Sequence, residues 1–114
     1  MEKRKHLRIG MDNLSVDVND GVGLFQGTVS DISRFGVRLS DLPKRLNGSV
    51  KKMTIVVSGK KHHFKMMVKP RWYSDDSGRK TVGAEILHTS WEWTEFVMRY
   101  EPVIVPDVWD EIRL

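Results

Sequence analysis

Residues 24–40 read LFQGTVSDISRFGVRLS, and they contain the pattern that decides the fold. The first part, Leu24–Ile32, is rich in Phe, Thr and Val, residue types that favour β-strands. In the second part, apolar Phe35, Val37 and Leu39 alternate with small or polar residues, a period of two that is typical of a half-buried strand. Around the junction of the two parts lie Asp31, Ser33 and Gly36, residue types that favour turns. The stretch therefore predicts two β-strands joined by a turn.

Strands and turns of the same kind are expected on both sides of this stretch. Before it, alternating Leu14, Val16 and Val18 predict a strand that ends in a turn at residues 19–21. After it, we expect a loop at residues 42–48, strands at 50–57, 61–73 and 80–87, and hairpin turns at 58–60 and 75–78. Because Pro70 cannot donate to a β-ladder, it marks a bulge or an edge segment. Six short strands with frequent turns favour a small antiparallel barrel or sandwich.

The period changes after residue 88. Thr89 is expected to cap a helix, with Glu92 three residues later as its partner in a capping box. Four apolar side chains then recur at the spacing of one helix face: Trp93, Phe96, Val97 and Tyr100. Pro102 ends the helix. We assign that face to the core, and the fold class is mainly β: a six-stranded antiparallel β-barrel closed by a C-terminal α-helix.

The length and the distribution of charge predict one domain with two charged ends. The chain has 114 residues, of which 39% are hydrophobic. Residues 1–8 are expected to form a flexible basic arm, followed by the barrel and helix at 9–101 and a tail at 102–114. The arm holds four basic residues and one acidic residue, a sum of +3, whereas residues 101–114 hold four acidic residues and one basic residue, a sum of −3. A basic arm suits a partner that carries phosphate, although a solvated terminus has the same composition.

Several classes of protein are not expected. No apolar run approaches the roughly 20 residues that span a bilayer, and no secretion signal follows the charged start. The absence of cysteine excludes disulfides and fits the cytoplasm. The sequence has no Gly-rich phosphate loop, nucleophile elbow or His-x-x-x-His motif, so we do not expect an enzyme. Adjacent His62 and His63 would point to opposite faces of a strand and could not share a metal ion.

The residues Asp31, Ser33 and Gly36 permit two interpretations. They can simply close a turn, with Asp and Ser bonding to the backbone and Gly supplying a positive φ. They also suit a guanine ligand, because a carboxylate can accept from its N1 and N2 donors, a hydroxyl can donate or accept, and glycine permits close approach. Arginine would complement such a site. Arg4 and Arg8 could bind guanine O6 and N7, or phosphate, with their planar guanidinium groups.

Two short motifs in register on this pattern carry a resemblance to a known family. Residues 4–8, RKHLR, fit an RxxxR motif, and residues 31–36, DISRFG, fit a [D/N]xSxxG motif at the expected separation. The expected strand at 82–86 resembles the glycine-bearing strand that precedes a helix in that family. From Lys3 to about Tyr100 the chain resembles a PilZ domain, the bacterial receptor module for the second messenger cyclic di-GMP.

The resemblance implies a six-stranded barrel whose N-terminal arm folds over cyclic di-GMP, with no other cofactor. Carried over by position, Arg4 and Arg8 would hold guanine and phosphate. Asp31 and Ser33 would recognise the base, and Gly36 would permit close approach.

Three further residues are candidates: Lys3, Trp72 and Gly83. Lys3 stands where family members often have another arginine, a position linked to whether one cyclic di-GMP or an intercalated pair is bound. The stoichiometry therefore stays open. Trp72, near the end of its strand, is either a core residue or a surface on which guanine stacks. Gly83 belongs to the glycine-bearing strand.

The resemblance further implies that ligand binding orders the arm and is relayed to an unidentified effector protein. Two alternatives stay open. One is a protein-interaction adaptor of the same fold that binds no nucleotide. The other is a small barrel that binds single-stranded nucleic acid, which is least favoured because the aromatic residues cluster in the C-terminal third.

Overall fold

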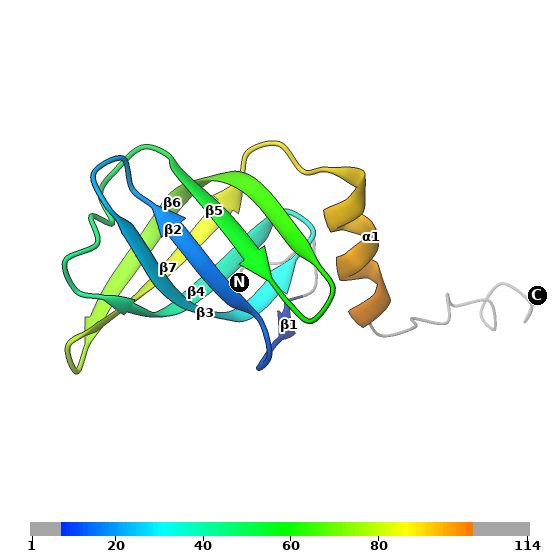
Figure 1. Cartoon of the computed structure of the whole chain (residues 1–114), viewed down its shortest axis with the longest axis horizontal. Coiled ribbons are helices and arrows are strands. Elements are labelled where there is room, and N and C mark those ends of the chain that lie inside the picture. The colour runs from blue at the N-terminus through cyan, green and yellow to red at the C-terminus, as the bar shows by residue number, and fades with distance from the viewer. Residues whose placement is uncertain (1–7, 102–114) are drawn as a thin grey trace, which may run out of the picture.

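The computed structural model describes residues 8–101, which form seven β-strands and one α-helix (Figure 1). The elements are β1 (Ile9–Gly10), β2 (Ser15–Asn19), β3 (Leu24–Ser33), β4 (Gly36–Pro43), β5 (Met53–Ser58), β6 (His63–Asp76), β7 (Arg79–Ile86) and α1 (Trp91–Tyr100). The arm residues Lys3 and Arg4 and the tail 102–114 lie outside the described residues. Between residues 8 and 101, no helix has the length and hydropathy that a membrane-spanning segment requires.

Six of the strands form a closed antiparallel barrel. The strand order is β1-β3-β2-β5-β6-β7-β4, and an additional pairing of β3 with β4 closes the ring. β1 lies outside the ring and adds two residues to the edge of β3, pairing Ile9 with Ile32 and Gly10 with Asp31. The predicted fold class is therefore confirmed. β1 escaped prediction because two residues are too few to show a period.

The alternation in the sequence accounts for the core of the barrel. In β3 and β4 the side chains of Phe25, Val29, Ile32, Val37 and Leu39 are all buried. Their neighbours along each strand are exposed or half-buried, as a pleated strand requires, and a register shift in β3 accommodates two such residues, Ser30 and Asp31, in succession.

Several predicted boundaries were wrong. β4 continues to Pro43, where a loop was expected, because Leu42 is fully buried and extends the inward-facing row. Phe35 precedes β4 and is 45% exposed. The β6–β7 hairpin turns only at Ser77 and Gly78, both with positive φ, as in a type I′ turn. β5 begins at Met53 rather than Val50.

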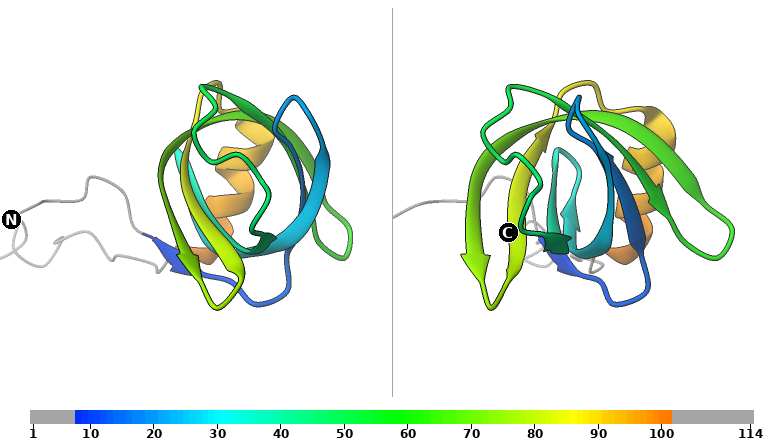
Figure 2. Two further views of the ribbon diagram at one scale, coloured as in Figure 1. Left: turned by 90° about the vertical axis from the view of Figure 1, so that its left-hand side faces the viewer. Right: turned by 60° about the vertical axis from the view of Figure 1, so that its left-hand side comes forward.

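The helix α1 lies against one end of the barrel and closes it (Figure 2). It buries Trp93, Phe96 and Val97, as the stripe predicted, but Tyr100 is 46% exposed and is not a core residue. The N-cap is Ser90, whose hydroxyl oxygen accepts from the Trp93 N–H at 3.1 Å. The predicted Thr89 cap and its capping box were therefore wrong by one residue.

Candidate ligand-binding site

One row of residues crosses five neighbouring strands on the outside of the barrel. Gly10 of β1 pairs with Asp31 of β3, and Asp31 pairs with Arg38 of β4. Arg38 pairs in turn with Gly83 of β7, and Gly83 pairs with Trp72 of β6. Ile32, Val37, Leu39, Val82 and Ala84, which adjoin these residues on β3, β4 and β7, are buried, so the row lies on the outer face of the barrel, with Gly83 covered by Trp72. We refer to these five residues as the outer row.

Asp31 lies between two arginines. Its Oδ1 is 3.8 Å from Arg8 Nη1, and its Oδ2 is 3.9 Å from Arg38 Nη1. Both distances are longer than a hydrogen bond, so neither guanidinium group occupies the hydrogen-bonding positions of the carboxylate. The Asp31 side chain is 17% exposed, whereas those of Arg8 and Arg38 are 40% and 48% exposed. The result is a locally cationic surface with an accessible carboxylate at its centre.

Trp72 forms the far end of the outer row. It is 39% exposed, so it is a surface residue rather than a core residue. Its indole lies directly over Gly83, where a Cβ would overlap the ring. The guanidinium carbon of Arg38 lies 5.7 Å from the centre of the Trp72 ring, within the range of a cation–π contact. A strand irregularity between Pro70 and Trp72 occurs where the proline predicted a bulge.

Ser33 and Gly36 close the turn between β3 and β4. The Ser33 hydroxyl donates to the Gly36 carbonyl at 3.4 Å, and the Ser33 carbonyl accepts from Trp93 Nε1 at 3.1 Å. Gly36 does not have a positive φ, so that expectation was wrong. A Cβ at Gly36 would instead lie 3.2 Å from the carbonyl oxygen of Ala84. Close packing against β7 therefore favours glycine here, because a Cβ would require the Ala84 backbone to shift by a few tenths of an ångström.

Arg34 lies inside the motif but pairs with Glu101 rather than with Asp31. Its Nε and Nη2 donate to the two carboxylate oxygens of Glu101, each at 2.8 Å. These hydrogen bonds raise the pKa of Arg34 above its ordinary value. Together with the Trp93 contact to Ser33, this ion pair fastens the motif turn to α1.

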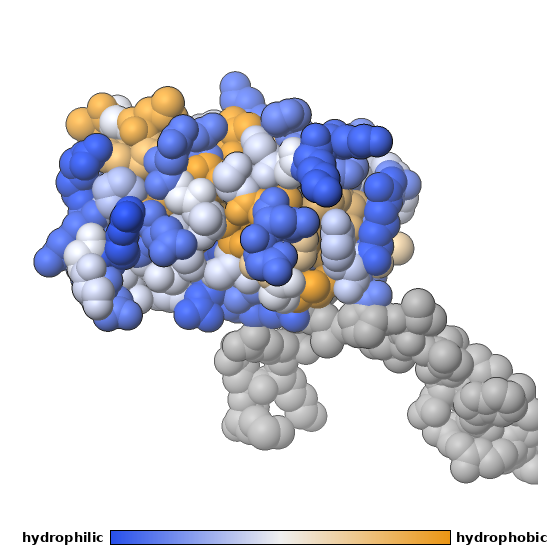
Figure 3. Space-filling model, turned by 60° about the horizontal axis from the view of Figure 1, so that its bottom comes forward, coloured by the Kyte–Doolittle hydropathy of each residue, from blue (hydrophilic) through white to orange (hydrophobic). Residues whose placement is uncertain are grey.

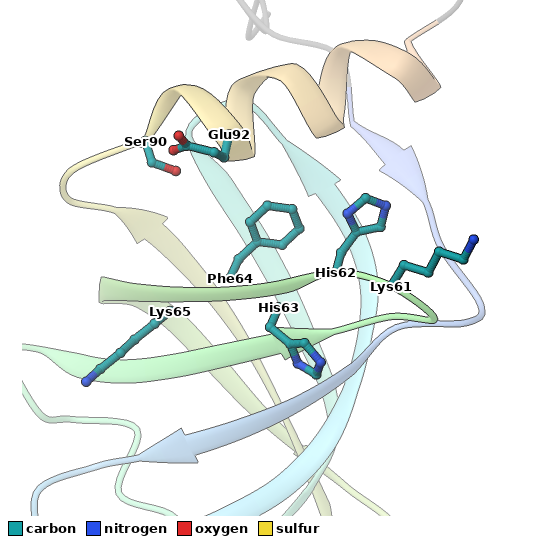
Figure 4. A pocket seen from close by; sticks show the side chains of 7 residues that line it. All are labelled: Lys61, His62, His63, Phe64, Lys65, Ser90 and Glu92. Atoms are coloured by element: carbon teal, nitrogen blue, oxygen red, sulfur yellow. The ribbon is translucent and has the colours of Figure 1, made fainter.

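A separate pocket of about 450 Å³ lies between the start of β6 and the start of α1 (Figure 4). It is lined by Lys61, His62, His63, Phe64, Lys65, Ser90 and Glu92. As expected, the two histidines point in different directions: His62 stacks on Phe64, and His63 lies 3.1 Å from the Ser58 hydroxyl. Within residues 8–101, no group of three or more His, Asp or Glu side chains could hold a metal ion.

No family model matches the chain, and no curated protein sequence matches it. Solved structures do. The PilZ domain of YcgR from Escherichia coli, described with c-di-GMP, superposes with a TM-score of 0.67 at 15% identity, over 98% of this chain and 95% of that one. The chain has a PilZ-like fold.

Other solved structures contain the same PilZ-like fold within longer proteins. Bacillus subtilis inhibitor of motility (MotI/DgrA) matches with a TM-score of 0.70 at 15% identity, over 88% of this chain and 50% of that one. Borreliella burgdorferi PlzA, in complex with c-di-GMP, matches with a TM-score of 0.59 at 15% identity, over 82% and 48%. The chain spans about half the length of each of these two proteins.

Sequence reasoning missed Arg38 on this PilZ-like barrel. The alternation in residues 35–40 placed it on the outer face of its strand, but nothing in the linear pattern paired it with Asp31. A hairpin register counted back from the motif turn would have found it, because Ser33 pairs with Gly36 across that turn. Of the predicted residues, the structure brings Arg8, Asp31, Gly83 and Trp72 together.

Proposed function

We propose that the chain is a cyclic di-GMP receptor without catalytic activity, and that the ligand binds on the outer row. One observation carries the proposal: Arg8 and Asp31 are far apart in the sequence, yet their side chains meet at 3.8 Å beside Arg38. Structures of the same fold described with c-di-GMP support the choice of ligand.

Each group in the row has a chemical match in the ligand. The Asp31 carboxylate accepts hydrogen bonds from the N1 and N2 donors of guanine. The guanidinium groups of Arg8 and Arg38 pair with phosphate oxygens or with guanine O6 and N7. The exposed indole of Trp72 supplies a stacking surface for a base, and base–aromatic stacking contributes about 1–3 kcal/mol. Hydrogen-bonding groups, cations and an aromatic ring therefore lie within one surface.

In this proposal Ser33 and Gly36 act mainly by positioning Asp31 rather than by binding the ligand. Ser33 already bonds to the turn and Gly36 packs against β7, so they hold Asp31 in position. The free lone pairs of the Ser33 hydroxyl can also accept from the ligand.

The arm supplies the rest of the site. Lys3 and Arg4 precede Arg8 in the sequence, and in the proposal residues 1–8 close over the bound nucleotide. This closure orders the arm and changes the surface presented to an effector protein in the cytoplasm. The position of Lys3 leaves open whether one nucleotide or an intercalated pair is bound, and calorimetric stoichiometry decides it.

Titration calorimetry with cyclic di-GMP tests the proposal. We expect saturable binding by the wild-type protein and a large loss of affinity in Arg8→Ala. Arg99→Ala is the control, because Arg99 on α1 is an even more exposed arginine (59% against 40% for Arg8) that forms a surface ion pair with Glu95 away from the outer row. Wild-type protein that gives no binding heat would favour the adaptor alternative. Displacement of cyclic di-GMP by a single-stranded oligonucleotide would favour the nucleic-acid alternative.

A further inference from the structure

The turn between β2 and β3 carries two apolar side chains that project into solvent. Val22 is 93% exposed and Leu24 is 69% exposed, the two highest values among the large hydrophobic residues described. Gly21 and Gly23 flank Val22, so the sequence from 21 to 24 contains no polar side chain. Figure 3 shows apolar side chains gathered at the end of the barrel that carries this turn. We refer to residues 21–24 as the apolar tip.

The backbone donors of the apolar tip are already satisfied by the protein. The Asn19 side-chain oxygen accepts from the Gly21 N–H at 2.8 Å. The Asp20 carboxylate accepts from the N–H groups of Val22 and Gly23 at 2.9 and 2.8 Å. An unpaired backbone donor is costly in a medium of low water content. The apolar tip can therefore leave water without leaving these three donors unpaired.

Four exposed basic residues lie in the segment that joins β4 to β5: Lys44, Arg45, Lys51 and Lys52. The Asp20 carboxylate also accepts from the Asn47 N–H at 3.1 Å and so fixes the 44–52 segment beside the turn. Arg45 lies over the ring of Phe25, with its guanidinium carbon 5.2 Å from the ring centre. We call these four residues the basic collar. The β6–β7 hairpin, which carries Asp75 and Asp76, lies across this end of the barrel from the β2–β3 turn (Figure 2), although Pro43, just before the collar, pairs with Arg79 of that hairpin.

We propose that this end of the barrel binds an anionic lipid surface, with the apolar tip inserted at the headgroup boundary and the basic collar facing the lipid phosphates. Exposed apolar residues flanked by Lys and Arg are the combination that interfacial binding needs. A projecting tip, rather than a groove, fits a deformable lipid surface better than an acidic protein. The tip shares no residue with the outer row, so this binding goes beyond the proposed nucleotide receptor.

Co-sedimentation with vesicles tests the proposal. We expect the protein to pellet with vesicles of phosphatidylcholine and phosphatidylglycerol, and to stay in solution with phosphatidylcholine alone. Each basic residue near an anionic surface strengthens binding by about fivefold, so the double variant Lys51→Glu/Lys52→Glu should lose well over tenfold. The matched control is Lys60→Glu/Lys61→Glu, which changes the same charge at the opposite end of β5. Equal losses in both variants would show diffuse charge attraction and overturn the proposal.

A second experiment tests whether the apolar tip inserts into the lipid, independently of the attraction between the basic collar and the anionic surface. Because the chain contains no cysteine, Val22→Cys gives a single site for an environment-sensitive fluorophore. We expect a blue shift of its emission with anionic vesicles, and none for the same label at Lys60→Cys. The variant Val22→Ser/Leu24→Ser should lose binding several-fold while the collar is intact. The proposal would be overturned if the wild-type protein did not pellet with anionic vesicles, or if it bound without a blue shift at residue 22. A protein that does not pellet would leave an acidic protein as the partner for the basic collar.

Discussion

Asp20 lies in the turn before β3 and Asp31 lies near the end of that strand, but their carboxylates are used in opposite ways. Asp20 is buried and accepts from three backbone N–H groups at 2.8 to 3.1 Å. Asp31 is partly exposed and faces two arginines at 3.8 and 3.9 Å, beyond hydrogen-bonding distance. A carboxylate that the fold has already satisfied stabilises the protein. One that is surrounded by cations but not bonded by them is available for a ligand.

The largest effect is expected from removing the available carboxylate. Asp31→Ala should weaken cyclic di-GMP binding roughly 100-fold, because hydrogen bonds to a charged group contribute about 1.5–3 kcal/mol. The free energy of unfolding should change by less than about 0.5 kcal/mol, since within the fold this carboxylate makes only two long ion pairs with partly exposed arginines. Calorimetry and urea unfolding of the same variant measure both quantities. Asp17→Ala, on β2 outside the row, is the control.

Removing the buried carboxylate of Asp20 should lower the stability of the protein without changing its affinity for cyclic di-GMP. Asp20→Ala leaves three backbone N–H groups without their acceptor and should lower the free energy of unfolding by about 2 kcal/mol or more. Urea unfolding measures this loss. Cyclic di-GMP affinity of the folded variant should equal that of the wild-type protein. An affinity loss as large as that of Asp31→Ala would break the distinction between the two aspartates.

The pH dependence of stability gives a further test of the structural role of Asp20. Burial alone would raise the pKa of Asp20, but the N–H groups of Asn47, Gly23 and Val22 outweigh it and hold the pKa below the ordinary value of 3.8. A lowered pKa means that the stabilisation is complete above that ordinary value and is lost as the pH falls through the folded-state pKa. The stability difference between the wild-type protein and Asp20→Asn should therefore shrink as the pH is lowered below 3.8. A difference that stays constant down to pH 2 would contradict this.

The smallest of these effects is expected at Arg38, which shares the ligand with Arg8. Arg38→Ala should weaken cyclic di-GMP binding by about tenfold, the value of one charge-assisted contact. The decline of affinity with salt should also become less steep, because fewer cations meet the phosphates. Calorimetry at two salt concentrations measures both. An unchanged affinity would remove Arg38 from the site and leave it only as a neighbour of Trp72.

Much of the fold followed from local periodicity, because the barrel strands bury alternate side chains. Leu14, Val16 and Val18 could be placed in the core from their alternation alone. Boundaries were less predictable, since they depend on packing: Leu42 extends β4 past an expected loop because its side chain fills the core. The N-cap was misplaced because Thr89 and Ser90 are equally suitable caps, and only the folded backbone selects Ser90.

The candidate site was only partly predictable, because its residues are brought together by strand pairing rather than by local sequence. Asp31 and Arg8 carried a motif, but the outer row depends on the register of five strands. Arg38 and Trp72 are separated from Asp31 along the chain and approach it only through those pairings. The reason for Gly36 was also misjudged. Its backbone needs no positive φ, and the constraint comes from Ala84 on another strand.

The most direct test of the central claim is chemical-shift mapping of the isotopically labelled protein during a titration with cyclic di-GMP. We expect amide chemical shifts to change around Asp31 and to stay nearly constant around Asp20. The largest amide shifts should occur at residues 8–10, at 31–38 and beside Trp72 and Gly83, with little change at 19–24. Shifts centred on the β2–β3 turn, or no shifts along the outer row, would contradict the assignment of Asp31 to the ligand.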